Sequence, residues 1–367
     1  MYYNDFNGLK ISALGFGALR LPMVEGEKNK IDREKGQIIL DAALKSGINF
    51  IDTAYTYLGG DSEKFLGEAL KKYPRDSYYL STKFYARHGV TIKEAFEIEC
   101  ERLQTDHIDF YLLHSLDEDF IEDYMDQETI DYLLELKRTG RVSFIGFSTH
   151  ATPDVLERFL DHFDGFDMAI MQLNYVDWTL LHAKEQYELL TKHNIPVWVM
   201  EPLKGGRLAT LNEKAEKILK EYDPDASLAS WGMRFLQGLE NVKTVMSGMN
   251  DVSQVEDNAK TFAERKPLSE EEYEVLMKAK EAFLEEMGVP CSACRYCCDT
   301  CPEELNIPLL IQGYNEFKIS GTTWKLPNFE KAKGAEHCVA CGECLKHCPQ
   351  NIDIPSIMEE FAGLLKK

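Results

Sequence analysis

Nine of the ten cysteines lie within the last 77 residues of the 367-residue chain, and eight of these form two runs of the same spacing. Each run has three cysteines at intervals of three residues and a fourth cysteine four residues later, directly before a proline. The runs are Cys291, Cys294, Cys297 and Cys301, and then Cys338, Cys341, Cys344 and Cys348. Thiolates at this spacing are typical of loops that bind [4Fe–4S] clusters.

The repeat also predicts which cysteines share a cluster. Three thiolates on a tight loop reach three corners of one cubane, whereas the fourth cysteine turns away and binds the other cluster. We therefore expect two [4Fe–4S] clusters, one bound by Cys291, Cys294, Cys297 and Cys348 and the other by Cys338, Cys341, Cys344 and Cys301. Zinc is the alternative, but it needs four ligands, typically as two separated pairs, and eight thiolates exceed that need.

Two cysteines have no role in this scheme. Cys298 is expected to be structural or a redox-sensitive spare thiol, and Cys100 lies in a helical pattern and is expected to be a buried core thiol. The double motif resembles the bacterial-type two-cluster ferredoxins. The 36 residues between Cys301 and Cys338 are more than a compact version needs, and Leu309–Phe317 has a helical pattern. The resemblance therefore implies a small, mainly helical ferredoxin-like domain.

Upstream of this domain, short β-rich runs alternate with amphipathic helical ones. Most runs are about five apolar residues long, as expected of parallel strands buried on both faces. We predict eight strands, at 12–17, 49–53, 78–83, 109–114, 143–148, 168–173, 197–201 and 243–247. Eight strand–helix repeats favour an α/β fold of the (β/α)8 barrel type. A doubly wound sheet is the alternative, but the glycine-rich dinucleotide fingerprint is missing after the first strand.

These patterns divide the chain into three parts. Residues 1–263 form the predicted barrel, 264–290 a connecting helix, and 291–367 the cysteine-rich domain. The connecting helix is predicted to begin with a capping box, because Glu272 follows Ser269 by three residues.

Active sites of (β/α)8 barrels lie at the C-terminal ends of the strands. Read in order, those ends carry Asp52 and Tyr57, Lys83, His114, Ser148 with Thr149, Gln172, and Glu201 to Leu203. Reduction of a carbonyl by hydride needs an acid, and a nearby ammonium would stabilise a phenolate and lower the pKa of a tyrosine. Lys83 would act in this way on Tyr57, and His114 would orient the carbonyl oxygen. Each residue alone could be structural, but their position on three consecutive strand ends favours a catalytic group.

These residues belong to stretches that resemble the aldo/keto reductase family over residues 8 to 262. The matching stretches are 50–57 with 60–63, 81–83, 112–114, 146–148, 172–175 and 254–258. The resemblance implies a catalytic tetrad of Asp52, Tyr57, Lys83 and His114. It also implies NADPH or NADH lying extended across the barrel mouth, and a small carbonyl or alcohol as the substrate.

The resemblance further implies the cofactor contacts. They are Ser148, Thr149 and Gln172 at the carboxamide, Leu203, Lys204 and Gly205 along the pyrophosphate, and Ser247, Gly248, Met249, Gln254 and Asn258 near the adenosine. Where many members have basic residues for a 2′-phosphate, this chain has Gly248, Met249 and Gln254, so NADPH and NADH both stay open. Met200 stands where an aromatic residue often stacks on the nicotinamide. Tyr175 and Trp178 suggest either an aromatic substrate wall or packing.

Charge and hydropathy exclude several classes of partner. The formal net charge of −21 argues against nucleic acid, because a binding surface must neutralise phosphates. No apolar run is long enough to span a bilayer, and no cationic segment followed by an apolar one marks a signal peptide. We therefore expect a cytoplasmic protein, in which clustered cysteines favour metal over disulfides.

Three functional hypotheses remain. The chain is an aldo/keto reductase whose clusters exchange electrons with a partner protein or a second cofactor, for which a flavin is one option. Alternatively, it is a plain nicotinamide-dependent carbonyl reductase whose clusters are structural or serve docking. The third hypothesis is a non-catalytic electron-transfer or redox-sensing protein, against which the complete tetrad argues. The second cofactor would convert between two-electron and one-electron steps, because hydride transfer moves two electrons and a cluster passes one.

Overall fold

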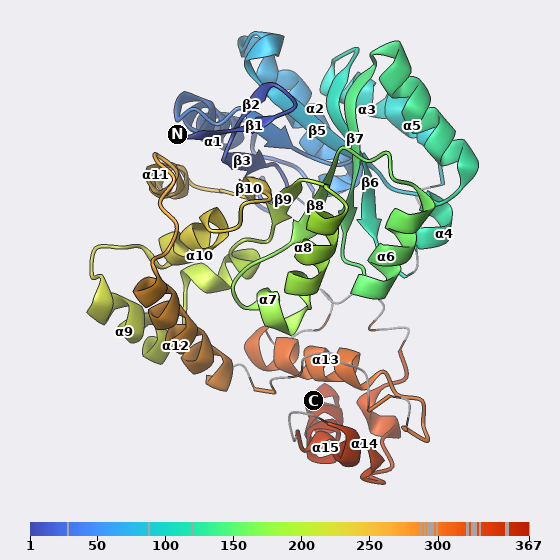
Figure 1. Cartoon of the computed structure of the whole chain (residues 1–367), viewed down its shortest axis with the longest axis vertical. Helices are drawn as coiled ribbons and strands as arrows, with labels where there is room; N and C mark the ends of the chain where they lie inside the picture. The colour runs from blue at the N-terminus through green and yellow to red at the C-terminus, as the bar shows by residue number, and fades with distance from the viewer. Residues whose placement is uncertain are drawn as a thin grey trace. The chain divides into compact units, whose positions relative to one another are not determined.

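A computed structural model describes residues 1–27, 29–86, 89–118, 120–286, 288–289, 291, 297–298, 300–320, 323, 329, 332–348 and 352–366. Figure 1 follows the chain from its N-terminus in blue to its C-terminus in red. The chain divides into two compact units. The first contains Met1–Tyr175, His182–Thr210 and Asp225–Tyr273, and the second contains Val176–Leu181, Leu211–Pro224 and Glu274–Lys367.

In the described part of the first unit, eight parallel strands close into a barrel in the order β10, β3, β4, β5, β6, β7, β8, β9. Their bounds are β3 Leu14–Gly17, β4 Phe50–Asp52, β5 Tyr79–Phe84, β6 Ile108–Leu116, β7 Val142–Thr149, β8 Met168–Gln172, β9 Val197–Met200 and β10 Val242–Ser247. Most of their residues are buried, because the strands are covered on both faces. The predicted (β/α)8 barrel is confirmed, and each predicted strand overlaps an observed one.

The first predicted strand begins too early. Residues 9–12 belong instead to a hairpin of two antiparallel strands, β1 (Tyr3–Phe6) and β2 (Leu9–Ser12). Its turn is Asn7-Gly8, with φ of 50° and 84°. Asn-Gly between two strands is a strong hairpin signal, so this element was readable from the sequence. Phe6 packs its ring against Phe144 and Trp198, with centroid distances of 4.9 and 5.0 Å, and covers the end of the barrel where the strands begin.

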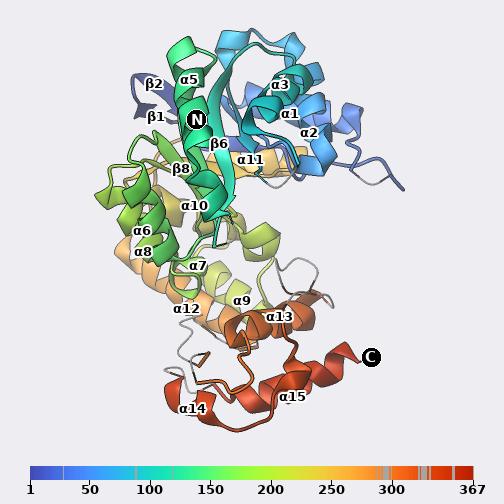
Figure 2. The same cartoon turned by 90° about the vertical axis from the view of Figure 1, so that its right-hand side faces the viewer.

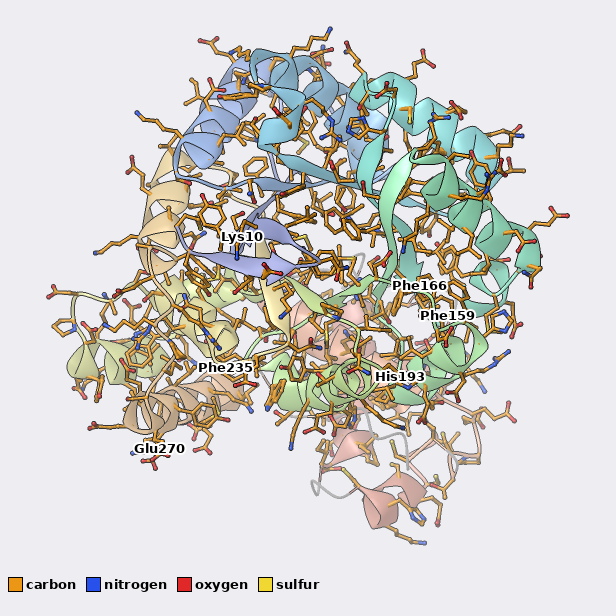
Figure 3. The ribbon with its side chains drawn as sticks, turned by 45° about the horizontal axis from the view of Figure 1, so that its top comes forward. Lys10, Phe159, Phe166, His193, Phe235 and Glu270 are labelled. Atoms are coloured by element: carbon orange, nitrogen blue, oxygen red, sulfur yellow. The ribbon has the colours of Figure 1, made fainter. Side chains whose placement is uncertain are left out.

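Helices follow most of the strands. In the first unit they are α1 Arg33–Lys45, α2 Asp61–Ala69, α3 Ile92–Leu103, α4 Ile121–Tyr124, α5 Gln127–Thr139, α6 Pro153–His162, α8 Ala183–Lys192, α10 Leu228–Gln237 and α11 Val252–Thr261. Local sequence explains several starts: Thr91 and Glu94 form a capping box before α3. Figure 3 shows how α6 packs: Phe159 lies beside Phe166, with ring centroids 5.2 Å apart.

The helix α12 (Glu270–Glu286) is the predicted connecting helix. Its capping box forms as expected, because the Glu272 N–H donates to Ser269 Oγ at 3.2 Å and the Ser269 N–H donates to the Glu272 carboxylate at 2.8 Å. Glu272 also accepts a hydrogen bond from Arg234 at 2.6 Å. The start of α12 is therefore fixed within the first unit, which contains all three residues.

The second unit is mainly helical in its described residues, as predicted for residues 291–367. It also contains Val176–Leu181 and Leu211–Pro224, from the part of the chain predicted as barrel. It contains α7 Asp177–Leu180, α9 Glu213–Tyr222, α13 Ile307–Ser320, α14 Glu343–His347 and α15 Ile354–Leu365. Figure 2 shows α13, α14 and α15 in red. Buried Ile311 of α13 and Phe361 of α15 belong to one apolar core, which the ring of Tyr314 joins at 5.9 Å from Phe361. Among the described residues, no helix combines the length and apolar character needed to cross a membrane.

Candidate active site and iron–sulfur sites

Three of the predicted catalytic residues lie near the ends of neighbouring strands. Asp52 of β4 pairs in register with Ser81 of β5, and Lys83 lies two residues beyond Ser81. Lys83 in turn pairs with Leu112 of β6, and His114 lies two residues beyond Leu112. The third is His114 of β6. Because strand side chains alternate with a period of two, this stagger keeps all three on the inner face of the barrel.

The Lys83 ammonium is held by three oxygen atoms. Its Nζ donates to both carboxylate oxygens of Asp52 at 2.7 Å and to the carbonyl of Thr53 at 2.6 Å. The Ser81 hydroxyl donates to Asp52 at 3.0 Å. Lys83 and Asp52 are almost inaccessible, with exposures of 1% and 4%. A buried ion pair is strongly fixed, because loss of one partner would leave an uncompensated charge.

Tyr57 reaches this pair from the 3₁₀ turn η1 (Tyr57–Gly60), which follows β4. Lys83 Nζ lies 5.0 Å from the Tyr57 ring centroid, so its charge acts on the phenol. Burial raises the pKa of Tyr57 above its ordinary value, and Lys83 opposes this rise without reversing it. The net direction is therefore opposite to the lowering expected from the sequence. The sequence identifies the neighbouring cation but not the desolvation that outweighs it.

The side chains of Lys83 and His114 have clear charge states. Burial works to lower the pKa of Lys83, but Asp52 and Tyr57 together raise it, so the ammonium is retained. Burial, with the charge of Lys83, holds the pKa of His114 well below its ordinary value. His114 is therefore neutral at physiological pH, and its Nδ1 is buried without a hydrogen-bond partner among the described residues. A neutral imidazole can donate a hydrogen bond to a carbonyl oxygen.

Aromatic rings surround His114. The rings of Tyr57 and Tyr85 lie edge-on to it, with centroids 5.6 and 5.7 Å away, and Tyr124 donates its hydroxyl to the His114 carbonyl at 2.5 Å. Tyr175, which the sequence offered as a substrate wall or as packing, is packing, because it is 1% exposed and lies against Phe235. The aromatic lining near the tetrad comes instead from the β5 end.

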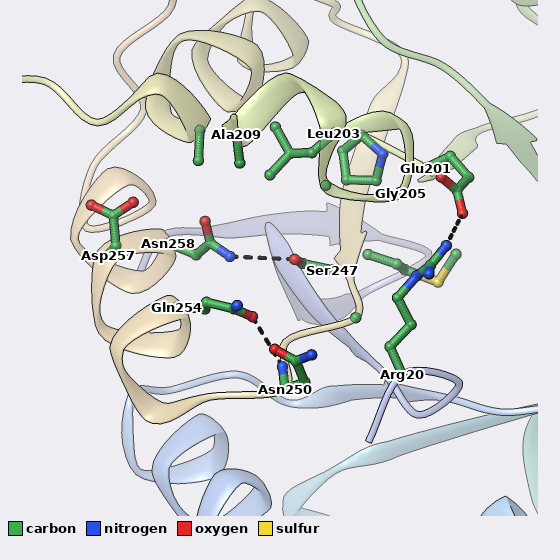
Figure 4. A pocket seen from close by; sticks show the side chains of 15 residues that line it. Arg20, Glu201, Leu203, Gly205, Ala209, Ser247, Asn250, Gln254, Asp257 and Asn258 are labelled. Atoms are coloured by element: carbon green, nitrogen blue, oxygen red, sulfur yellow. Dashed lines mark hydrogen bonds and ion pairs between the residues drawn. The ribbon is translucent and has the colours of Figure 1, made fainter. Parts of the chain in front are cut away.

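A pocket of about 290 Å³ adjoins the C-terminal ends of β9 and β10 (Figure 4). This volume is close to the lower end of the range for small-molecule and cofactor sites, about 300 Å³. Six of the predicted cofactor contacts line it: Leu203, Gly205, Ser247, Gly248, Gln254 and Asn258. Asn258 donates to Ser247 Oγ at 3.3 Å, and Gln254 accepts from the Asn250 N–H at 3.0 Å. Gly205 and Gly206 have φ of 67° and 97°, so the backbone approaches the pocket without side chains.

The other five predicted contacts do not line this pocket in the described residues. Thr149 and Met249 are fully buried. The Thr149 hydroxyl donates a hydrogen bond to the Leu116 carbonyl and accepts one from the Ala151 N–H. Ser148 is buried at the end of β7, where its Oγ accepts from the Ser115 N–H at 2.8 Å. Gln172, at the end of β8, and Lys204 are partly buried.

Sequence reasoning assigned no binding role to three charged residues that line the pocket. Arg20 follows β3 and donates to Glu201, directly after β9, at 2.9 Å (Figure 4). Asp257 of α11 accepts from Ser227 at 2.7 Å. The strand-end rule pointed to Glu201, but no local signal connects it with Arg20, 181 residues away. Arg20 is the one cation among the residues that line this pocket, and Glu201 pairs with it.

Four thiols of the second unit line one small cavity of about 20 Å³. They are Cys301, Cys338, Cys341 and Cys344, the set predicted for one cluster. Burial and the sulfurs of Cys338, Cys341 and Cys301 raise the pKa of Cys344 to about 11. No three His, Cys, Asp or Glu side chains of the described residues form a site for a single metal ion. Four cysteines on one cavity match the number of thiolate ligands of a [4Fe–4S] cluster.

The other predicted set is described only in part. Cys294 lies outside the described residues. A hydrogen bond from the Cys297 thiol to Cys298, followed by burial and the charges of Cys298 and Cys291, raises the pKa of Cys297, so these three thiols are neighbours. Cys348 accepts a weak hydrogen bond from the Ile352 N–H at 3.5 Å. Cys100 is a buried thiol whose pKa burial raises to about 11, in agreement with a core role.

Comparison with known proteins decides the family. Residues 13–281 match the profile of the aldo/keto reductase family, and residues 290–352 match that of a 4Fe-4S dicluster domain. The chain belongs to the aldo/keto reductase family. It is an oxidoreductase of that family with a 4Fe–4S domain at its C-terminal side.

Relatives of this aldo/keto reductase match the barrel. L-galactose dehydrogenase of Arabidopsis thaliana is 29% identical over 311 residues, covering 76% of this chain and 92% of that protein. The NADH-specific methylglyoxal reductase of Escherichia coli is 28% identical over 247 residues, covering 60% and 71%. The holo form of an aldo-keto reductase from Bacillus halodurans has a TM-score of 0.63 at 30% identity, covering 76% and 96%.

Proposed function

We propose that the barrel transfers hydride between a nicotinamide cofactor and a small carbonyl or alcohol substrate, with Tyr57 as the general acid and base. The observation that carries this proposal is the buried Lys83 ammonium, held by both oxygens of Asp52 and 5.0 Å from the centroid of the Tyr57 ring. Family membership supports it, because the related proteins include a dehydrogenase and a reductase.

Each residue of the tetrad has one task in this proposal. When bound, the nicotinamide supplies or accepts the hydride. In the reducing direction Tyr57 donates its proton to the oxygen that develops negative charge, and Lys83 stabilises the phenolate that remains. Asp52 holds Lys83 in place, and neutral His114 orients the carbonyl oxygen by a hydrogen bond.

The pH profile of kcat/KM for carbonyl reduction tests these assignments. Tyr57 is active as an acid only while protonated, and its raised pKa keeps it protonated above pH 9. His114 is neutral well below pH 6.5, so it does not titrate in the working range. We expect kcat/KM to stay level from about pH 6 to about pH 9 and to fall at higher pH. A loss of activity centred near pH 6.5 would contradict the assignment of His114.

We also propose NADH as the preferred cofactor. The adenosine end of the pocket offers the amides of Gln254, Asn250 and Asn258 together with the Asp257 carboxylate. Arg20, the one cation of the pocket lining, pairs with Glu201. A 2′-phosphate would therefore meet a carboxylate and neutral groups, whereas a 2′-hydroxyl is neutral. The similarity to an NADH-specific reductase supports this preference.

Replacing Gln254 by arginine is expected to improve the Kd for NADPH by about tenfold or more, because a charged hydrogen bond to phosphate contributes about 1.5–3 kcal/mol. The Kd for NADH should change little. Quenching of protein fluorescence during cofactor titration measures both constants. Gln254→Met is the control, since it keeps the length of the side chain without adding charge. Tighter binding of NADPH than of NADH by the unchanged protein would contradict the proposal.

For the second unit we propose two [4Fe–4S] clusters, one held by Cys301, Cys338, Cys341 and Cys344 and the other by Cys291, Cys294, Cys297 and Cys348. The cavity that the first set lines supports this division. The clusters would supply one-electron transfer. They would exchange electrons with a partner protein or a second cofactor such as a flavin, because nicotinamide accepts electrons in pairs.

A further inference from the structure

Arg102, near the end of α3, reaches the loop that carries Tyr57. Its Nη1 donates to the carbonyl oxygen of Tyr55 at 3.2 Å, and its guanidinium carbon lies 4.4 Å from the centroid of the Tyr55 ring. The Arg102 side chain therefore contacts both the backbone and the ring of Tyr55, two residues before Tyr57. A guanidinium above an aromatic ring is an attractive contact even when it is partly exposed.

The loop itself has an unusual backbone. Leu58, Gly59 and Gly60 follow one another in the left-handed region, with φ of 53°, 61° and 87°. For Leu58 this conformation is unfavourable, so the loop needs contacts that hold it. Gly60 also has no room for a side chain, because a Cβ built there would lie 2.7 Å from the guanidinium carbon of Arg102. Glycine and arginine at these two positions fit each other.

A buried carboxylate fixes the other side of Arg102. Glu63 of α2 is fully buried and accepts from Arg102 Nη1 at 3.0 Å and from the Thr82 hydroxyl at 2.7 Å. Thr82 directly precedes Lys83 on β5. A continuous series of contacts thus runs from the backbone before Tyr57, through Arg102 and Glu63, to the strand that carries Lys83.

A second buried carboxyl group lies in the same region but plays a different part. Glu99 of α3 is fully buried, and burial followed by the charge of Glu63 raises its pKa well above the ordinary value. Both carboxyl oxygens of Glu99 are buried without a hydrogen-bond partner among the described residues, whereas Glu63 forms the ion pair with Arg102 at 3.0 Å. Exchange of each carboxyl group for an amide of the same shape should consequently have very different effects.

We propose that Arg102, Glu63 and Gly60 form a clamp that holds the Tyr57 hydroxyl against Lys83, with Arg102 as a positioning residue for proton transfer. The inference rests on the proposed role of Tyr57. Because the clamp touches neither the cofactor pocket nor the reacting atoms, its loss changes the rate of the chemical step and leaves cofactor binding intact. A displacement of a catalytic group by about 1 Å can lower a rate by about 10²-fold.

The experiment compares Arg102→Met with Arg141→Met in the full chain. Arg141 is the matched control, because it also lies over a ring, Phe96 at 4.8 Å, and pairs with a glutamate of α3, Glu97 at 3.0 Å, but does not touch the tyrosine loop. For Arg102→Met we expect kcat for carbonyl reduction to fall about 10- to 100-fold. The Kd for NADH should stay within about twofold, and amide hydrogen exchange of residues 54–61 should accelerate. Arg141→Met should show none of these changes.

Two further pairs of variants distinguish loss of the clamp from general damage to the fold. Glu63→Gln should lower kcat as Arg102→Met does, because it removes the charge that pairs with Arg102. Glu99→Gln should leave kcat unchanged, since no ion pair joins Glu99 to Arg102 among the described residues. Gly60→Ala should lower kcat more than Gly59→Ala, because both have positive φ but the nearest atom to a Cβ at Gly59 is 3.8 Å away. In an Arg102→Ala background the excess loss of Gly60→Ala should disappear.

Hydrogen exchange and kcat together distinguish failure of the clamp from failure of the proposed function. Unchanged hydrogen exchange of residues 54–61 in Arg102→Met would overturn the clamp, whatever the activity. Faster exchange with unchanged kcat would instead show that the clamp exists but that Tyr57 is not the proton donor. Equal losses of kcat in Glu63→Gln and Glu99→Gln would also overturn the clamp, because they would indicate a nonspecific effect of altering this buried region.

Discussion

Replacing Tyr57 by phenylalanine is expected to lower kcat for NADH-dependent carbonyl reduction by about 10²- to 10⁴-fold, the usual contribution of a positioned general acid. The change removes one hydroxyl and keeps the ring that lies over Lys83 at 5.0 Å. The Asp52–Lys83 ion pair, which does not depend on the phenol, should remain in place. Steady-state rates with an excess of a small aldehyde measure the effect, and cluster absorbance should be unchanged.

Tyr85→Phe is the control for this variant. Its ring lies 5.7 Å from His114, almost the same distance as the ring of Tyr57, and the substitution is chemically identical. We expect its kcat to stay within about threefold of the unchanged protein, because the Lys83 ammonium lies over the ring of Tyr57, the proposed proton donor. Comparable rates for Tyr57→Phe and the unchanged protein would remove Tyr57 from the mechanism.

Paired cysteine substitutions should lose one cluster or two, according to which ligands they share. If Cys301 belongs with Cys338, the double variant Cys301→Ser with Cys338→Ser loses one cluster and keeps about four iron atoms per chain. The double variant Cys301→Ser with Cys291→Ser damages both sites and keeps none. Iron analysis after anaerobic reconstitution, with absorbance near the cluster bands, measures the difference.

Cys298→Ser is the control, because the proposed scheme leaves this thiol out of both clusters although it lies beside Cys297. It should retain about eight iron atoms. The opposite pattern, in which the pair Cys301 and Cys291 loses a single cluster, would mean that each run of four binds its own cluster. Loss of iron in Cys298→Ser would add this residue to the ligands.

The strand-end residues were the most predictable part of the site. Asp52, Lys83 and His114 each end a buried run, and the period of side chains along a strand places them on one face of the barrel. The thiols around the cavity were predictable from spacing alone, since the repeat of the two runs determines which cysteines come together.

Other features depend on contacts that no local pattern reveals. Arg20 and Glu201 meet across 181 residues, and Arg102 meets Tyr55 across 47. The direction of the pKa shift of Tyr57 is set by burial, which depends on the complete packing of the site. The burial of Thr149 and Met249 likewise follows from the packing of neighbouring elements and not from their own sequence.

The order of strands in the barrel has a consequence for synthesis of the chain. β3 pairs with β10, where Leu14 lies opposite Val245, so the first barrel strand must wait for a partner 231 residues later. At about 5–20 residues per second, roughly 12 to 46 s pass on the ribosome before that partner exists. Until then the inner edge of β3 and the ring of Phe6 lack their final covering. The cysteine runs emerge later still, so iron is loaded onto a chain whose barrel residues have already been made.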